Sequence, residues 1–169
     1  KVVLGIDPSL RGTGYGVIRL GQSGPKTLSQ GTVKCSSKLE RSRCLMEISG
    51  TIREVIRKHQ PTVCAIEGLF YAQNVKTALT MGEARGAALA VLAESGLEIS
   101  EIARRKVKQS IAGYGNAQKS AVAKMMQRML TLKELPAPDP AAPLALPPPF
   151  LPLPTRFATD PAPHITTTP

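Results

Sequence analysis

The first third of the chain alternates short apolar runs with glycine, proline and polar residues, a pattern typical of strands joined by turns. Residues 2–4 are β-branched or leucine and too few for a helix, so they predict a buried strand that ends at Asp7. Glycines then alternate with apolar residues over 12–18, which indicates a second strand hairpinned onto the first. Residues 21–25 are expected to form a loop, and residues 28–33 predict a third strand.

From residue 37 onward the apolar residues recur at helical spacing, with basic residues on the other faces. This pattern predicts an amphipathic helix that packs on a sheet and ends before Pro61. Residues 62–67 then predict another strand, residues 75–95 a second helix, and residues 97–102 an edge strand. Further helices are expected at 106–112 and 117–132. The first helical stripe consists of Leu45, Ile48, Ile52, Val55 and Ile56.

Two acidic residues stand where two of these strands end. A strand, a helix and a strand in sequence indicate a right-handed crossover, which makes the two strands parallel neighbours. Asp7 and Glu67 would then lie close together at corresponding strand ends. Asp7 alone would be interpreted more simply as a turn cap, because aspartate often caps turns. The pair predicts an α/β protein with a site at this edge of its sheet.

The charge of the chain favours a polyanionic partner. Residues 1–135 contain 21 bases and 10 acids, a net charge of +11, whereas residues 136–169 contain one base and two acids. A strongly basic folded region favours nucleic acid over a small acidic substrate, although a basic soluble surface has the same composition.

The proline content divides the chain in two. Twelve of its fifteen prolines lie in residues 136–169, so a continuous helix is excluded there and extended or disordered chain is expected. Residues 1–135 are therefore predicted to be the folded domain. Cys35, Cys44 and Cys64 lack the paired spacing of a zinc site, and no apolar run reaches membrane-spanning length. A reducing, cytoplasmic location is expected.

Several motifs, in order along the chain, resemble those of the RuvC family, bacterial Holliday junction resolvases, over residues 2–146. The first motif runs from Gly5-Ile-Asp-Pro8 to Thr13-Gly-Tyr-Gly16, with Ser9 where the family usually has glycine. The others are Ala65-Ile-Glu-Gly-Leu-Phe-Tyr-Ala-Gln-Asn74, Gly82-Glu-Ala-Arg-Gly-Ala87, Val107-Lys-Gln109, Gly113-Tyr-Gly115 and Lys119.

The resemblance implies a ribonuclease H-like fold, with a mixed five-stranded sheet flanked by helices on both faces. It also implies a homodimer that binds four-way junction DNA and cooperates with branch-migration proteins. Asp7, Glu67 and Asp139 would be the catalytic ligands of Mg²⁺ or Mn²⁺. Phe70 would stack on an unpaired base at the crossover, while Lys108 and Lys119 would contact DNA near the scissile phosphate.

The sequence departs from the family pattern near its C-terminal end. The family presents its last two acids in a segment that here reads Asp139-Pro-Ala-Ala-Pro-Leu-Ala-Leu146. Matching the final Leu-Ala-Leu places Asp139 at the third acidic position and Ala142 at the fourth, and a shift by one places Pro143 there. Three explanations of this departure remain open: a shifted reading frame or cloning artefact, a junction-binding homologue that does not cut, or a weakened site that Asp139 completes with a water. We favour the first and expect this chain to cut poorly.

Three functions therefore compete. The leading one is a structure-selective, metal-dependent DNA endonuclease, and the second is a junction-binding protein without nuclease activity. The third, a nucleotide-hydrolysing or kinase-like protein, would need a second phosphate loop that the sequence lacks. Gly82 and Gly86, with Ala87 and Ala90, form a smooth face of the second helix, which is expected to pack either on the sheet or against a twin helix across a two-fold axis. Arg85 on the same helix is expected to form a structural salt bridge.

Overall fold

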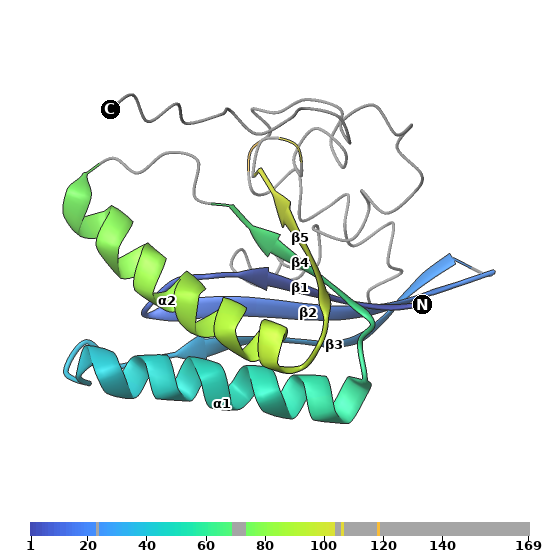
Figure 1. Ribbon diagram of the computed structural model, residues 1–169, viewed down its shortest axis with the longest axis horizontal. Coiled ribbons are helices and arrows are strands. Elements are labelled where there is room, and N and C mark those ends of the chain that lie inside the picture. Colours follow the sequence, from blue (N-terminus) through green and yellow to red (C-terminus); the bar gives the residue numbers. More distant parts are fainter. Residues whose placement is uncertain (23, 69–73, 104–105, 107–117, 119–169) are drawn as a thin grey trace, which may run out of the picture.

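The fold is a single five-stranded sheet with two long helices, as seen in a computed structural model that describes residues 1–22, 24–68, 74–103, 106 and 118 (Figure 1). Along the sheet the strand order is β3-β2-β1-β4-β5. The elements are β1 (Val2–Asp7), β2 (Gly12–Gly21), β3 (Gly24–Lys34), α1 (Arg41–His59), β4 (Val63–Glu67), α2 (Val75–Glu94) and β5 (Glu98–Ile102).

The sheet is mixed, as the sequence predicted. β2 is antiparallel to both β1 and β3, whereas β4 is parallel to both β1 and β5. The predicted first hairpin and the crossover through α1 are therefore both confirmed. Three antiparallel strands followed by two parallel strands in this order form a ribonuclease H-like sheet, in which β1 occupies the centre.

The core lies between the sheet and the helices. Figure 1 shows α1 and α2 side by side on one face of the sheet. Their buried residues join the alternate residues of β1, β2 and β4 that point toward them, because successive side chains in a strand point to opposite faces. Fully buried members of this cluster are Leu4, Ile6, Val17, Cys44, Ile48, Cys64, Ile66, Ala84, Ala88 and Leu92.

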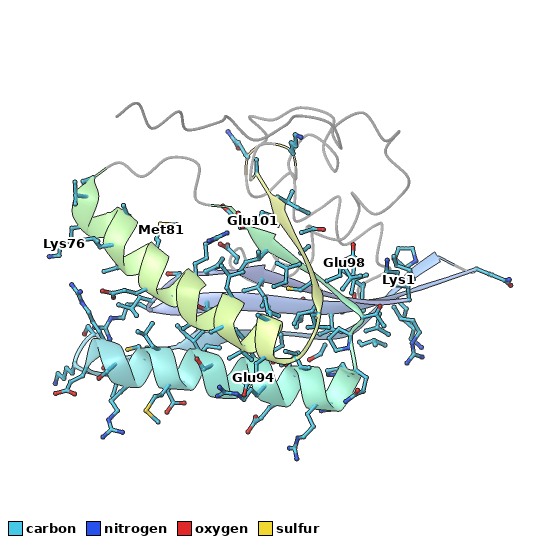
Figure 2. All side chains as sticks on the ribbon, in the orientation of Figure 1. Lys1, Lys76, Met81, Glu94, Glu98 and Glu101 are labelled. Carbon is cyan, nitrogen blue, oxygen red and sulfur yellow. The ribbon has the colours of Figure 1, made fainter. Side chains whose placement is uncertain are left out.

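Ion pairs connect the helices to each other and to the sheet. Arg41 of α1 pairs with Glu83 of α2 at 3.1 Å, and Arg53 pairs with Glu94 at 3.2 Å. Arg85 of α2 pairs with Glu101 of β5 at 2.5 Å, which confirms the structural salt bridge expected for this arginine. Figure 2 labels two of these glutamates, Glu94 at the end of α2 and Glu101 on β5. The two pairs between the helices are exposed, and such pairs each stabilise a fold by about 1 kcal/mol or less.

The loop expected at 21–25 is present but shorter than predicted. Pairing between β2 and β3 continues to Gly21 and Gly24, so Pro25 already lies within β3, opposite Leu20. Gly24 has a φ of +98°, which a residue with a side chain rarely adopts, and this lets the chain reverse sharply. Pro25 is tolerated because β3 is an edge strand and can lack a hydrogen-bond donor.

Several predictions lie outside the described residues. They are the helices at 106–112 and 117–132 apart from Lys106 and Gln118, and the proline-rich segment 136–169 with the boundary that precedes it. The resemblance implied helices on both faces of the sheet. The described helices, α1 and α2, cover one face. No helix in the described part of the chain is long and apolar enough to cross a membrane.

Candidate active site at the carboxyl ends of β1 and β4

The strand register places the two predicted carboxylates side by side. β1 and β4 pair in parallel, with Gly5 opposite Ala65 and Ile6 opposite Ile66. The next residues along the two strands are Asp7 and Glu67, the last residue of each. Since neighbouring strands lie about 4.8 Å apart, the two acidic residues are adjacent at one edge of the sheet. The pairing predicted from the sequence is thus found.

Both acidic side chains project from the face that α1 and α2 do not cover. Ile6 and Ile66 belong to the core cluster beneath the helices. Because side chains alternate along a strand, the next residue on each strand points to the opposite face. Asp7 and Glu67 therefore share one face of the sheet, and the sheet itself separates them from the helix layer.

Small residues surround Asp7 on this face. Gly14 of β2 lies directly opposite Asp7, and Gly16 lies opposite Gly5 in the preceding row. Ala65 of β4 completes that row. Gly14, Gly16 and Ala65 are themselves buried, and small residues let other atoms pack closely against the sheet beside Asp7.

Glu67 is buried at the end of β4. Its exposure is 8%, and it is one of two buried polar or charged residues in the described part of the chain, the other being Thr13. Ile102 of β5 flanks it, and the next amide, Gly68, donates a 3.1 Å hydrogen bond to the Ile102 carbonyl. A buried glutamate beside a second carboxylate is costly unless positive charge balances the pair.

The donor set of this pair suits a hard divalent cation. Carboxylate oxygens are the ligands that Mg²⁺ and Mn²⁺ prefer. Within the described residues no group of three or more histidine, cysteine or acidic residues converges. The described chain thus supplies two acids to the site, and Asp139, the third predicted ligand, lies outside the described residues. The same holds for the predicted DNA contacts Phe70, Lys108 and Lys119.

The three cysteines take no part in this site. Cys64 is fully buried in β4, and burial raises the pKa of its thiol, so it is a core residue as expected. Burial, followed by a hydrogen bond with Cys44, raises the pKa of Cys35 to about 11. Both Cys35 and Cys44 are buried behind the sheet, in the core cluster with α1.

The residues that hold the turn after Asp7 were not predicted from the sequence. Thr13 is fully buried, and its hydroxyl donates to the Ser9 carbonyl at 2.6 Å and accepts the Ser9 amide at 3.1 Å. Arg11 reaches from the same turn toward α1. The signal available was a lone hydroxyl residue between Gly12 and Gly14, which a sequence pattern does not distinguish from an ordinary strand residue.

The glycine-containing face of α2 does not pack on the sheet, so that alternative is wrong. Ala84, Ala88, Val91 and Leu92 are the buried residues of this helix. A Cβ added at Gly82 or Gly86 would meet no atom within 4 Å beyond the neighbouring backbone. Along the same stripe, Val75 is 75% and Leu79 is 60% exposed.

Known proteins match most of the chain. The sequence profile of the family described as crossover junction endodeoxyribonuclease RuvC matches residues 3–146. The protein of that name from Caldicellulosiruptor saccharolyticus is 42% identical over 141 residues, which cover 83% of this chain and 85% of that protein. The Hahella chejuensis protein is 42% identical over 146 residues, which cover 85% and 83% of the two chains.

A solved structure shows the same likeness in three dimensions. Thermus thermophilus RuvC, solved in complex with a Holliday junction substrate, superimposes with a TM-score of 0.79 at 33% sequence identity. The superposition covers 86% of this chain and 89% of that one. The family match over residues 3–146 contains Asp7 and Glu67 and both helices.

Proposed function

The chain belongs to the RuvC family of crossover junction endodeoxyribonucleases, and we propose that it cuts four-way DNA junctions at the carboxyl ends of β1 and β4. A related protein has been solved with a Holliday junction substrate. The formal charge of +10 suits a DNA partner, because basic residues neutralise backbone phosphates. Membership of this family argues against the third function, a nucleotide-hydrolysing or kinase-like protein. A cytoplasmic location follows from a DNA substrate of this kind.

The observation that carries this proposal is the acid pair itself. Asp7 and Glu67 end adjacent parallel strands and share one face, and Glu67 is buried there. Together with Asp139, these residues would hold Mg²⁺, or Mn²⁺ in its place. When bound, the ion lowers the pKa of a coordinated water and stabilises negative charge on the leaving oxygen of a phosphodiester.

The residues of the chain fix where this chemistry occurs. Asp7 and Glu67 are held by a central strand pair whose other face is locked into the core, so their carboxylates are positioned before substrate arrives. Asp7 is partly exposed, so a phosphate can approach it, whereas the neighbouring Gly14 and Gly16 are buried. Phe70 would stack on a base opened at the crossover, and Lys108 and Lys119 would contact the DNA backbone beside the site.

A homodimer formed through α2 fits the exposed stripe on this helix. Val75, Leu79, Gly82 and Gly86 lie at spacings of four, three and four residues, so they share one helix face. Each glycine costs a helix about 1 kcal/mol relative to alanine, and no contact within the described chain requires either one. Close approach of a second helix would require them, and two-fold symmetry would present two sites to a junction.

The dimer proposal has a matched test. Leu79→Lys places a charge on the stripe, whereas Met46→Lys does the same on α1 at a residue of similar exposure, 62% against 60%. Light scattering after size-exclusion chromatography should give a monomer for Leu79→Lys and a dimer for the wild type and Met46→Lys. A Leu79→Lys protein that remains a dimer would exclude this face.

The nuclease proposal is tested on a synthetic four-way junction with Mg²⁺ or Mn²⁺, with linear duplex of the same sequence as control. Symmetric nicks in the junction and none in the duplex are expected. The alternative, a junction-binding protein that does not cut, rests on Ala142 at the fourth acidic position. Tight, salt-sensitive junction binding without nicks, with cutting restored by Ala142→Asp and replacement of the nearby prolines, would favour it. Equal binding to junction and duplex would exclude both.

A further inference from the structure

The turn between β1 and β2 is fastened to the helix side of the sheet, behind the carboxylates. Leu10 in this turn is 7% exposed and belongs to the core cluster. The Gly12 amide donates to the Ser9 carbonyl at 3.3 Å, and the Thr13 hydroxyl bonds to both backbone groups of Ser9. The turn after Asp7 is thus held by hydrogen bonds between its own residues, and Leu10 packs in the core.

Arg11 connects this turn to the segment between β3 and α1. Its Nη1 donates to the carbonyls of Leu39, at 2.8 Å, and Ser36, and it lies 3.0 Å from the Cys44 sulfur. The Arg11 carbonyl in turn accepts the Cys35 amide at 3.2 Å. Side chain and backbone of one residue therefore bind the same neighbouring segment.

The position of this guanidinium contrasts with its place in the sequence. Arginine side chains commonly contact DNA phosphates, and Arg11 lies four residues after Asp7 in the sequence. Cys44 belongs to α1, on the face that the helices cover, whereas Asp7 and Glu67 project from the opposite face. Arg11 thus uses its charge on backbone carbonyls behind the site.

We propose that Arg11 is a positioning residue, which anchors the turn to the β3–α1 segment and so fixes the direction in which Asp7 presents its carboxylate. This proposal rests on the proposed nuclease function. Loss of the anchor would let the end of β1 move relative to β4, and small misplacements of reacting groups reduce rates by as much as about 10²-fold. DNA affinity would not depend on Arg11.

The test separates positioning from phosphate contact by comparing a charge-retaining with a charge-removing substitution. Arg11→Lys keeps the charge but loses the planar fork, and Arg11→Gln removes both. The control is Lys38→Gln, which removes an exposed charge from the same segment. Single-turnover cleavage rates and junction dissociation constants are measured at two or more salt concentrations, after the unfolding midpoint of each variant has been determined.

Positioning predicts that Arg11→Lys and Arg11→Gln both cut about tenfold to a hundredfold more slowly, with junction affinity and its salt dependence unchanged. Lys38→Gln should cut at the wild-type rate. A phosphate contact would instead weaken binding in Arg11→Gln, reduce the salt slope by about one and spare Arg11→Lys, and this would overturn the proposal.

Hydrogen exchange on the wild-type protein tests the proposal without relying on variants that fold. The amides of Ser9, Gly12 and Cys35 should be protected in the DNA-free protein, and junction binding should not change that protection. A change on binding would show that the anchor opens to reach DNA. If the wild type binds junctions but does not cut, the nuclease function fails, while this exchange measurement still tests whether the turn stays attached to the β3–α1 segment when DNA binds.

Discussion

The two faces of the β1–β4 strand pair carry different side chains: apolar residues on the helix side and an acidic pair on the other side. On the helix side, Ile6 and Ile66 are fully buried in the core. One residue later, on the other face, Asp7 and Glu67 end the same strands. Because side chains alternate along a strand, consecutive residues of one rigid strand pair serve core packing and the acidic site.

The largest expected effect comes from neutralising one carboxylate on the outer face. Glu67→Gln keeps the shape of the side chain but removes its charge, so junction cleavage should fall on the order of 10³-fold. Junction affinity should be kept or slightly improved. The rate is measured in single-turnover gels, with Glu98→Gln at the opposite end of the parallel strands as the matched control. Wild-type cleavage by Glu67→Gln would place the chemistry elsewhere.

The next largest effect lies one residue away, on the inner face. Ile66→Ala removes buried methyl groups from a fully buried residue, so the free energy of unfolding should fall by about 2–5 kcal/mol. Ile66→Val should cost about 0.5–1.5 kcal/mol. Urea unfolding measures both changes. Folded Ile66→Val protein should cut junctions at the wild-type rate, and a cleavage defect without a stability defect would contradict the separation of the two faces.

The strands and the acid pair could be predicted from the sequence because their signals are local. The apolar run before Asp7 and the one before Glu67 identify buried parallel strands, and the helical stripe between them fixes the crossover. Neighbouring parallel strands then bring their carboxyl ends together. Topology alone therefore predicts which acids meet.

The anchoring of the active-site turn could not be predicted in this way. Arg11 bonds to residues 25 and 28 positions further along the chain, and no periodic pattern encodes such contacts. Which face of α2 would be buried was also undetermined, because alanine and leucine occur on both sides of this helix. Burial in the folded chain is what distinguishes its two faces.

Substitution by alanine at two glycines, Gly31 and Gly50, should change the free energy of unfolding in opposite directions. A Cβ at Gly31 would lie 2.7–2.8 Å from the Tyr15 ring, across the β2–β3 pair, so Gly31→Ala should lower the free energy of unfolding by about 1–3 kcal/mol. At Gly50, inside α1, a Cβ meets nothing within 4 Å, and Gly50→Ala should raise it by about 0.5–1 kcal/mol. Thermal unfolding measures both, and equal signs would contradict the described packing.

The smallest effect is expected at the end of α1, far from either carboxylate. Burial, and then the neighbouring Lys58 charge, lower the pKa of His59 below its usual range. The unfolded chain thus binds this proton more readily than the folded protein, so the contribution of His59 to stability is full above about pH 6.5 and declines as the pH falls below it. His59→Gln should flatten the stability–pH curve in that window. An unchanged curve would contradict this pKa direction.

The central claim is that Asp7 and Glu67 together hold one divalent cation on the outer face of the sheet, and Mn²⁺ binding tests it most directly. Binding is measured by electron paramagnetic resonance for the wild type, Asp7→Asn, Glu67→Gln and the double variant. We predict that each single substitution weakens the tightest site and that the double variant loses little more, because coupled ligands are not additive. Wild-type affinity in either single variant would contradict the claim.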